Sequence, residues 1–219
     1  MKNYSSPAKI IIAFFVSFLA ISSALPQQYG DPFKGIENSK VLPMLRHLPR
    51  KYGGMNVPAS DGRLLYDLII KNGYRRGLEI GTSNGYSGLW LGLAFQQTGG
   101  TLITIEIEKK RAEEARENFN DAGLDKVIDS RINDAFSEIP EIEGDFDFVF
   151  IDAWKPDYID FFKLLRSRIK PGGAITAHNV SDLGSQMQDF LNAIREDSGL
   201  ETKIIKSSNS GVSISIVKK

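Results

Sequence analysis

The chain has 219 residues, enough for one domain with a substantial hydrophobic core. Its 27 basic and 27 acidic residues give a formal net charge of zero, which does not support nucleic-acid binding, because such proteins usually carry a basic excess. There is no cysteine, and this excludes disulfides, thiolate metal sites and a cysteine nucleophile.

The first 24 residues have the pattern of a secretory signal peptide. Lys2 and Lys9 precede an uncharged apolar run at 10–21, and Ser-Ser-Ala follows at 22–24. The run is shorter than the ~20 residues that a membrane-spanning helix needs. We expect cleavage after Ala24 and export to the periplasm or the medium. An uncleaved membrane anchor is the alternative.

The rest of the chain divides into two parts. Residues 25–52 are expected to form a leader rich in Pro, Gly and Gln with one short helix, and residues 53–219 to form the main domain. Ser60 is the expected N-cap of the first long helix, which ends at Asn72-Gly73.

From residue 77 onward, strand patterns alternate with helix patterns. Strands are expected at 78–80, 101–106, 127–132, 146–151, 174–177, 202–205 and 212–217, and helices at 87–97, 108–122, 157–170 and 185–197. This alternation predicts an α/β fold with a doubly wound, mostly parallel, seven-stranded sheet. The turn at 207–211 is too short for a parallel crossover, so the last strand is expected to be antiparallel.

The segment LEIGTSNGYSG at 78–88 reads as a strand, a glycine-rich turn and a helix start. Such a turn lets a ligand approach the backbone, and the helix N-terminus favours negative charge. Ser83 stands where a dinucleotide site would have its second glycine, which leaves less room for a pyrophosphate. The same letters also contain Gly81-x-Ser83-x-Gly85, the outline of a hydrolase nucleophile elbow.

Polar residues end four of the expected strands. Glu79 and Glu106 belong to the first two strands, Asp152 follows the fourth, and His178-Asn179 follow the fifth. Ligands of doubly wound sheets bind beyond the carboxyl ends of the strands, so we expect one shared site. Glu106 is expected to accept hydrogen bonds from ribose hydroxyls, with a carboxylate at a helix start as the alternative.

Six blocks resemble the S-adenosylmethionine-dependent O-methyltransferases of the catechol and caffeoyl-CoA type. In order they are MNV at 55–57, LEIGTSNGYSG, ITIEIE, FDFVFIDAWKPDY, KPGG and AHNV. The resemblance runs from about Met55 to the C-terminus. It implies a Rossmann-like methyltransferase fold, S-adenosylmethionine as cofactor and methyl transfer to a phenolic, catechol-like oxygen of a small molecule. A homodimer is compatible with it.

The resemblance also assigns cofactor-binding roles. The residues that would hold S-adenosylmethionine are Met55, Asn56 and Val57 along its methionine part, Glu79, Gly81 and Ser87 at its carboxylate and amino group, Glu106 at the ribose, Asp134 and Ala135 at the adenine, and Asp152 near the amino group.

The resemblance assigns the remaining roles to the fourth and fifth strand ends. Lys155 would be the general base, and Trp154 would line the substrate pocket. Asp152 and Asn179 would bind a divalent metal such as Mg²⁺ or Mn²⁺. Oxygen ligands suit such a cation, which would lower the pKa of an acceptor phenol.

His178 departs from the family pattern, which usually has an aspartate before the asparagine. Imidazole suits transition metals better than Mg²⁺. Three roles are open: a ligand of Mn²⁺, Fe²⁺ or Zn²⁺, a general base without a metal, or a packed histidine at a site that has lost activity.

Two other functions remain as alternatives. Ser83, Asp152 and His178 occur in the chain order of an α/β-hydrolase triad, but the elbow would follow the first strand and no His-Gly-Gly-Gly segment precedes it. A non-catalytic domain that binds S-adenosylmethionine is the second alternative, because an exported chain would be separated from a methyl donor made in the cytoplasm.

Overall fold

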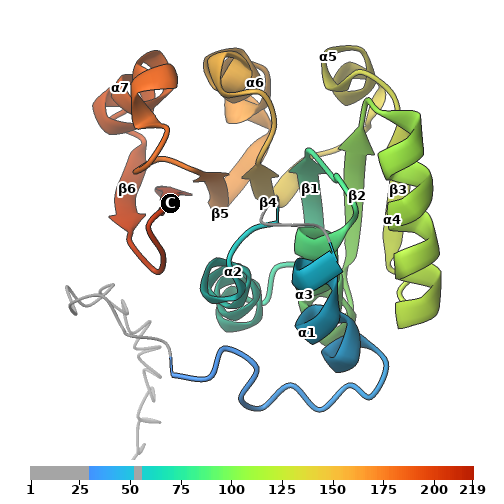
Figure 1. Cartoon of the computed structure of the whole chain (residues 1–219). Coiled ribbons are helices and arrows are strands. Elements are labelled where there is room, and N and C mark those ends of the chain that lie inside the picture. Colours follow the sequence, from blue (N-terminus) through green and yellow to red (C-terminus); the bar gives the residue numbers. More distant parts are fainter. Residues whose placement is uncertain (1–29, 52–55) are drawn as a thin grey trace, which may run out of the picture.

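The computed structural model describes residues 30–51 and 56–219 (Figure 1). The expected signal peptide and Met55 lie outside these residues. None of the helices within the described ranges has the length and apolar character needed to cross a membrane.

Fourteen regular helices and strands make up the described part of the fold. The strands are β1 (Arg76–Ile80), β2 (Thr101–Glu106), β3 (Ile128–Ile132), β4 (Phe146–Ile151), β5 (Ile169–His178), β6 (Leu200–Ile205) and β7 (Val212–Val217). The α-helices are α1 (Val41–Lys51), α2 (Ala59–Asn72), α3 (Tyr86–Thr98), α4 (Lys109–Ala122), α5 (Ala135–Glu138), α6 (Tyr158–Leu165) and α7 (Gln188–Glu196). Short 3₁₀ turns lie at Ile139–Glu141, Lys155–Asp157, Arg166–Arg168 and Gly184–Gln186.

The seven strands form one sheet in the order β3-β2-β1-β4-β5-β7-β6. Strands β1 to β5 pair in parallel, whereas β7 is antiparallel to both β5 and β6. This confirms the predicted doubly wound sheet and its antiparallel last strand. The strand order reverses between β1 and β4, which places the expected ligand crevice at their carboxyl ends.

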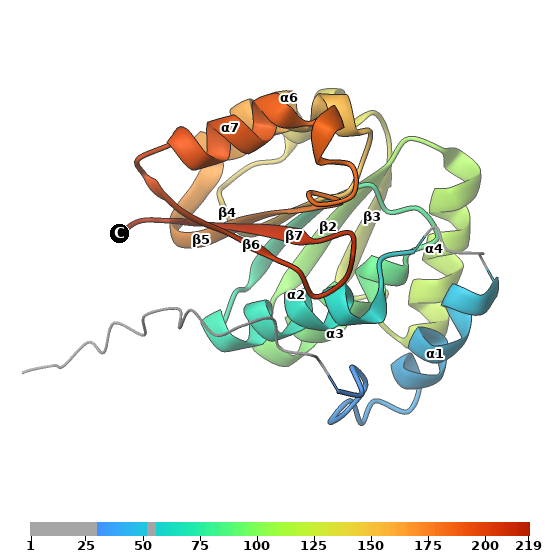
Figure 2. The same cartoon turned by 60° about the vertical axis from the view of Figure 1, so that its left-hand side comes forward.

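Helices cover both faces of the sheet (Figure 2). Residues of α1 to α4 pack with one face, and residues of α5, α6 and α7 pack with the other. Strand β4 contributes to both layers: Phe148 and Phe150 belong to the first core, and Val149 and Ile151 to the second. The alternation follows from the two-residue period of a strand, and β4 is therefore buried on both faces.

Several element ends differ from those predicted. Helix α2 begins at Ala59 after Pro58, so Ser60 is not its N-cap. Strand β5 begins at Ile169, inside the segment predicted as helix, because Phe146 pairs with Ile169 before a register shift brings Phe148 opposite Ala174. Helix α5 was not predicted, and its four residues are too short for a periodic signal.

Candidate active site

The carboxyl ends of β1 and β4 meet at Gly81. Asp152 N donates to the Ile80 carbonyl at 2.9 Å, and a Cβ added at Gly81 would lie only 2.2 Å from the Asp152 carbonyl oxygen. Gly81 also has a φ of +97°, a conformation that side chains rarely adopt. Only glycine therefore allows this close contact of the two strand ends.

The turn between β1 and α3 is held by its own backbone and by Glu106. Gly85 N donates to the Thr82 carbonyl at 2.9 Å, and Ser83 N donates to Glu106 Oε2 at 2.7 Å. Glu108 N donates to the other oxygen, Oε1, at 3.0 Å. Glu106 thus accepts a bond at the start of α4 as well as one from the turn, and each carboxylate oxygen keeps a further lone pair for a ligand hydroxyl.

Glu79 is fully buried at the end of β1. Its Oε2 accepts a hydrogen bond from Thr104 Oγ1 at 2.6 Å, while its Oε1 has no partner among the described residues. Burial raises the pKa of Glu79 to about 7, although hydrogen bonds from Ser87 and Thr104 act in the opposite direction. An unpaired buried carboxylate oxygen is costly unless a ligand supplies a donor. Glu79, the turn that begins at Gly81, and Glu106 together form what we call the cofactor cradle. The cradle therefore fits a ligand with a cationic donor such as an ammonium group.

Four other residues expected at the cofactor come from the segment before α2 and from the start of α5. Asn56 is half-buried, and its amide nitrogen has no partner in the described ranges, while Val57 is buried. Asp134 Oδ2 accepts from Ser137 N at 3.1 Å and caps α5, whose first residue is the buried Ala135. Asp134 thus has a local structural role.

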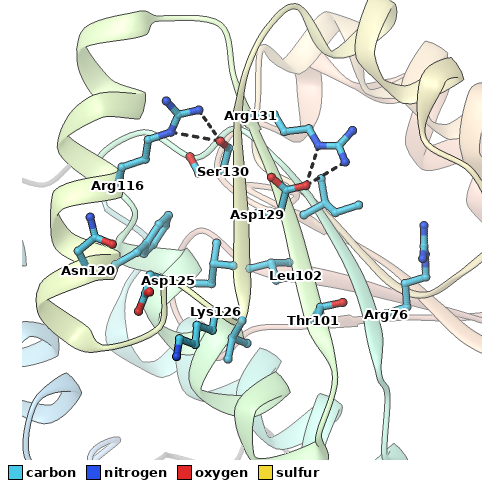
Figure 3. A pocket seen from close by; sticks show the side chains of 14 residues that line it. Arg76, Thr101, Leu102, Arg116, Asn120, Asp125, Lys126, Asp129, Ser130 and Arg131 are labelled. Atoms are coloured by element: carbon cyan, nitrogen blue, oxygen red, sulfur yellow. Dashed lines mark hydrogen bonds and ion pairs between the residues drawn. The ribbon is translucent and has the colours of Figure 1, made fainter.

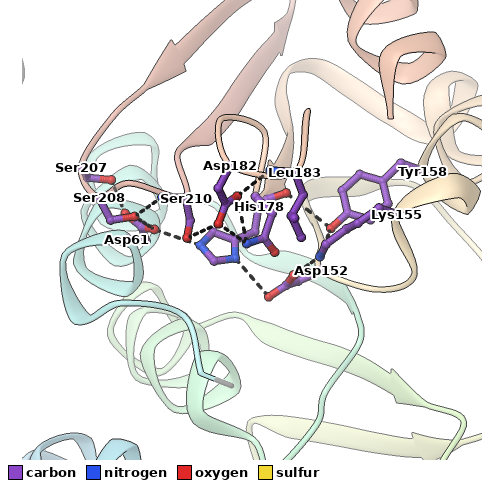
Figure 4. Close-up of polar contacts among 11 residues, drawn as sticks. Asp61, Asp152, Lys155, Tyr158, His178, Asp182, Leu183, Ser207, Ser208 and Ser210 are labelled. Carbon is purple, nitrogen blue, oxygen red and sulfur yellow. Dashed lines mark hydrogen bonds and ion pairs between the residues drawn. The ribbon is translucent and has the colours of Figure 1, made fainter. Parts of the chain in front are cut away.

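A lysine and a carboxylate pair at the end of β4 (Figure 4). Lys155 Nζ donates to Asp152 Oδ1 at 2.8 Å and to the Tyr158 hydroxyl oxygen at 2.9 Å. Trp154, next in the chain to Lys155, is 69% exposed. The three residues are neighbours in the sequence, and the structure adds the bond between the predicted base and its carboxylate partner.

His178 lies between two carboxylates (Figure 4). Its Nε2 donates to Asp61 Oδ2 at 2.9 Å, and its Nδ1 lies 3.4 Å from Asp152 Oδ2. Burial alone would lower the pKa of His178, but the hydrogen bonds with Asp152 and Asp61 outweigh it and raise the pKa to about 9. A neutral imidazole has one N–H, so donation at both nitrogens requires the charged form.

Asp61 completes this cluster from the other side. It is fully buried on α2 and accepts hydrogen bonds from the hydroxyls of Ser207 and Ser208 in the turn between β6 and β7, the second at 2.6 Å. Burial raises the pKa of Asp61, but the bonds from His178 and the two serines outweigh it and lower the pKa overall.

Sequence reasoning missed Asp61 and both serines. One signal was available: Asp61, Leu65 and Ile69 share a helix face at a spacing of four, so a carboxylate stands on the apolar stripe of α2. A charged side chain without a partner is not expected on a buried helix face, so the position of this carboxylate indicates a partner from another part of the chain.

The expected metal ligands do not fit a divalent cation. Both nitrogens of His178 face carboxylates, and the two oxygens of Asp152 face Lys155 and His178, two cationic groups. Asn179 has a φ of +60°, and its amide donates to Asp182 at 3.3 Å. Within residues 30–51 and 56–219, no group of three or more carboxylate or imidazole side chains could hold a metal.

The hydrolase alternative is not supported by this geometry. A serine nucleophile needs a base with a free ring nitrogen in hydrogen-bond reach. His178 offers none, because Asp61 and Asp152 take both nitrogens. Ser83 has a φ of +49° and its N–H is bound to Glu106, which makes it a turn residue.

A cavity of about 590 Å³ lies elsewhere, beside the edge strand β3 (Figure 3). None of the predicted site residues lines it. Two of its basic side chains have local partners: Arg116 donates to the Ser130 carbonyl, and Arg131 pairs with Asp129. It does not belong to the candidate active site.

Comparisons with known proteins agree on one family. A model of a family described as O-methyltransferase matches residues 35–203. A catechol O-methyltransferase from Niastella koreensis is 35% identical over 130 residues, which are 58% of this chain and 58% of that protein. A flavonoid 3',5'-methyltransferase from Vitis vinifera is 28% identical over 191 residues, 81% of this chain and 78% of that protein.

A solved structure extends this agreement to three dimensions. The O-methyltransferase from Streptomyces achromogenes in complex with S-adenosylmethionine has a TM-score of 0.71 and 26% identity to this chain, over 82% of this chain and 90% of that one. Because the family model covers more than half of the sequence, this chain belongs to the O-methyltransferase family.

Proposed function

We propose that this chain transfers the methyl group of S-adenosylmethionine to a phenolic oxygen of a small molecule, with a catechol-like acceptor as the first choice. The observation that carries the proposal is the buried Oε1 of Glu79, which has no partner in the part of the chain that the structure describes and lies two positions before Gly81. Family membership and the similarity to an S-adenosylmethionine-bound structure support it.

S-adenosylmethionine supplies a methyl group on a positively charged sulfur. In the proposal, Glu79 Oε1 accepts from the ammonium group of the methionine part, and Gly81 gives the backbone room for close approach. Glu106 binds the ribose hydroxyls, while Met55, Asn56, Val57, Ser87, Asp134 and Ala135 complete the site as the family resemblance implies.

Lys155 takes the acceptor proton in this proposal. A phenol has a pKa near 10, so it needs a base before its oxygen can attack the methyl carbon. Lys155 first releases a proton to solvent, and its neutral Nζ then takes the proton of the acceptor. A lone pair of the acceptor oxygen forms the new O–C bond, and the electrons of the broken C–S bond remain on sulfur. Asp152 fixes the position of Nζ. The exposed ring of Trp154, the neighbouring residue in the chain, packs against the aromatic acceptor.

The substitution Lys155→Met tests the base. We expect kcat to fall by roughly 10²–10⁴-fold, the usual contribution of a general base, with the Kd of S-adenosylmethionine unchanged. Lys163→Met is the matched control, because Lys163 is an exposed lysine on α6 paired with Asp160. A Lys155→Met enzyme as active as this control would remove Lys155 from the mechanism.

Calorimetry with S-adenosylmethionine tests the broader proposal. Failure to bind at millimolar concentration would contradict it. Binding without transfer to any phenolic acceptor would favour the alternative of a non-catalytic domain.

Export is a separate proposal that rests on residues 1–24. Charged, apolar and small residues follow one another there in the order that signal peptidase recognises. The N-terminal sequence of the protein recovered from producing cells tests it. A mature chain that starts at Leu25 supports cleavage, and an intact Met1 in the membrane fraction supports an anchor.

A further inference from the structure

We propose that Asp61 is a positioning residue that holds the His178 imidazolium against Asp152, and that this ion cluster replaces a divalent cation in the reaction. The inference rests on the proposed methyl transfer for its kinetic consequences. Its structural part, a fixed imidazolium and the lack of metal binding, is measured without turnover.

The position of Asp61 is set by three parts of the fold. It lies on the buried face of α2, receives hydroxyl donors from the β6–β7 turn and bonds to His178 at the end of β5. The turn itself is fixed, since Ser181 N donates to the Ser210 carbonyl at 2.8 Å and a Cβ on Gly211 would lie 2.3 Å from Ser181 Oγ. Asp61 therefore has little freedom to move away from His178.

The charges of the cluster balance without a metal. Asp61 and Asp152 contribute two negative charges. His178 contributes one positive charge, and Lys155 contributes the second once it has taken the acceptor proton. Asp152 shares its charge between two cations, one on each oxygen. Fixed positive charge in a half-buried site favours an anionic acceptor oxygen, which is also what a metal ion would do.

A divalent cation would meet two obstacles here. To bind His178 it would have to replace the proton on Nδ1, which faces Asp152 Oδ2 at 3.4 Å, because Asp61 already holds Nε2. It would also approach two groups of its own sign. The electrostatic repulsion is strong in a buried environment, where charges are poorly screened.

Metal binding gives the first test. We expect calorimetric titration of the full chain with MnCl₂ or MgCl₂ to show no binding at millimolar metal. We also expect the methyl-transfer rate to be the same in EDTA as in added Mg²⁺. Stoichiometric metal binding, or loss of activity in EDTA that Mn²⁺ restores, would overturn the proposal.

Asp61→Asn gives the second test, because it keeps the shape of the side chain and removes its charge. We expect kcat to fall by roughly 10–100-fold, the usual effect of removing a partner that orients a functional group. The KM for S-adenosylmethionine should stay within about twofold, since Asp61 is not part of the cofactor cradle. An unchanged kcat would overturn the positioning role. Asp67→Asn on the same helix is the matched control, because Asp67 is half-exposed and pairs only with Arg63 in the described structure.

Ring nitrogen NMR gives a readout that does not depend on activity. The chain has only two histidines, so His47→Gln assigns both sets of signals. We expect two protonated ring nitrogens for His178 at neutral pH in the wild type and a changed signal in Asp61→Asn. A neutral His178 in the wild type would overturn the proposal even if transfer were never detected. If Asp61→Asn fails to fold, Ser208→Ala removes one donor to Asp61 and is expected to lower kcat less, in the same direction.

Discussion

At the scale of single residues, Glu79 combines a carboxyl pKa of about 7 with one oxygen that has no partner in the described structure. A carboxyl group attracts an ammonium only when it is ionised, so binding should strengthen as pH rises through this pKa. We expect the Kd of S-adenosylmethionine to increase roughly tenfold from pH 8 to pH 6, as the ionised fraction falls. Calorimetry at both pH values measures it.

Glu79→Gln is the control for this prediction. The amide has a similar shape and no titration, so its Kd should be weaker at pH 8 and vary less with pH than that of the wild type. Wild-type affinity in Glu79→Gln would mean that the carboxylate does not contact the cofactor.

The same scale shows which site residues a sequence can reveal. Glu79, Glu106 and Asp152 could be predicted because each ends a strand, and the strand ends of a doubly wound sheet converge. Asp61 could not be placed in the site, because its partner His178 is 117 positions away and no motif joins them. The partners of both ring nitrogens of His178 are also set by tertiary contacts, so the sequence alone does not decide among its three possible roles.

At the scale of elements, the junction of β1 and α3 depends on Gly81. An alanine there would place Cβ 2.2 Å from the Asp152 carbonyl oxygen and would also be strained at a φ of +97°. We expect Gly81→Ala to lose S-adenosylmethionine binding and to lower the free energy of unfolding by several kcal/mol, because backbone atoms on both sides must move. Urea unfolding and calorimetry measure the two effects.

Gly73→Ala is the matched control for the close contact. Gly73 also has a positive φ, +63°, but a Cβ there would meet nothing within 4 Å. It should lower the free energy of unfolding by only about 1 kcal/mol, the cost of the left-handed conformation, with cofactor binding intact. Equal effects of the two substitutions would show that φ alone matters.

Element order was predictable, whereas some element ends were not. The order of the elements follows from the alternation of periodic segments. The antiparallel direction of β7 follows from the short turn at 207–211. The start of β5 depends instead on pairing with Phe146 and on the register shift that follows. These are contacts between distant segments, and local periodicity contains no information about them.

At the scale of the whole molecule, the ion cluster of Asp61, His178 and Asp152 joins α2, β5 and β4, with the β6–β7 turn bonded to Asp61. The titration of the groups in this cluster should therefore change the free energy of unfolding of the whole domain. The pKa of His178 is raised from 6.5 to about 9, so its contribution is complete below pH 6.5 and is lost as pH rises through 9. The pKa values of Asp61 and Asp152 are lowered, so their contribution is lost as pH falls below about 4.

We expect the free energy of unfolding to decline by about 1 kcal/mol per pH unit between pH 7 and pH 9, since the unfolded chain releases the His178 proton there and the folded chain retains it. Urea unfolding at half-unit pH steps measures the slope. Glu79 contributes a decline of the same sign at lower pH, from 4.5 through about 7, and this decline is nearly complete at pH 8, so the range above pH 8 isolates the histidine. In His178→Gln the slope above pH 8 should be nearly flat, whatever the absolute stability of that variant. A wild-type profile that is equally flat would mean that His178 is not held as an imidazolium between its two carboxylates.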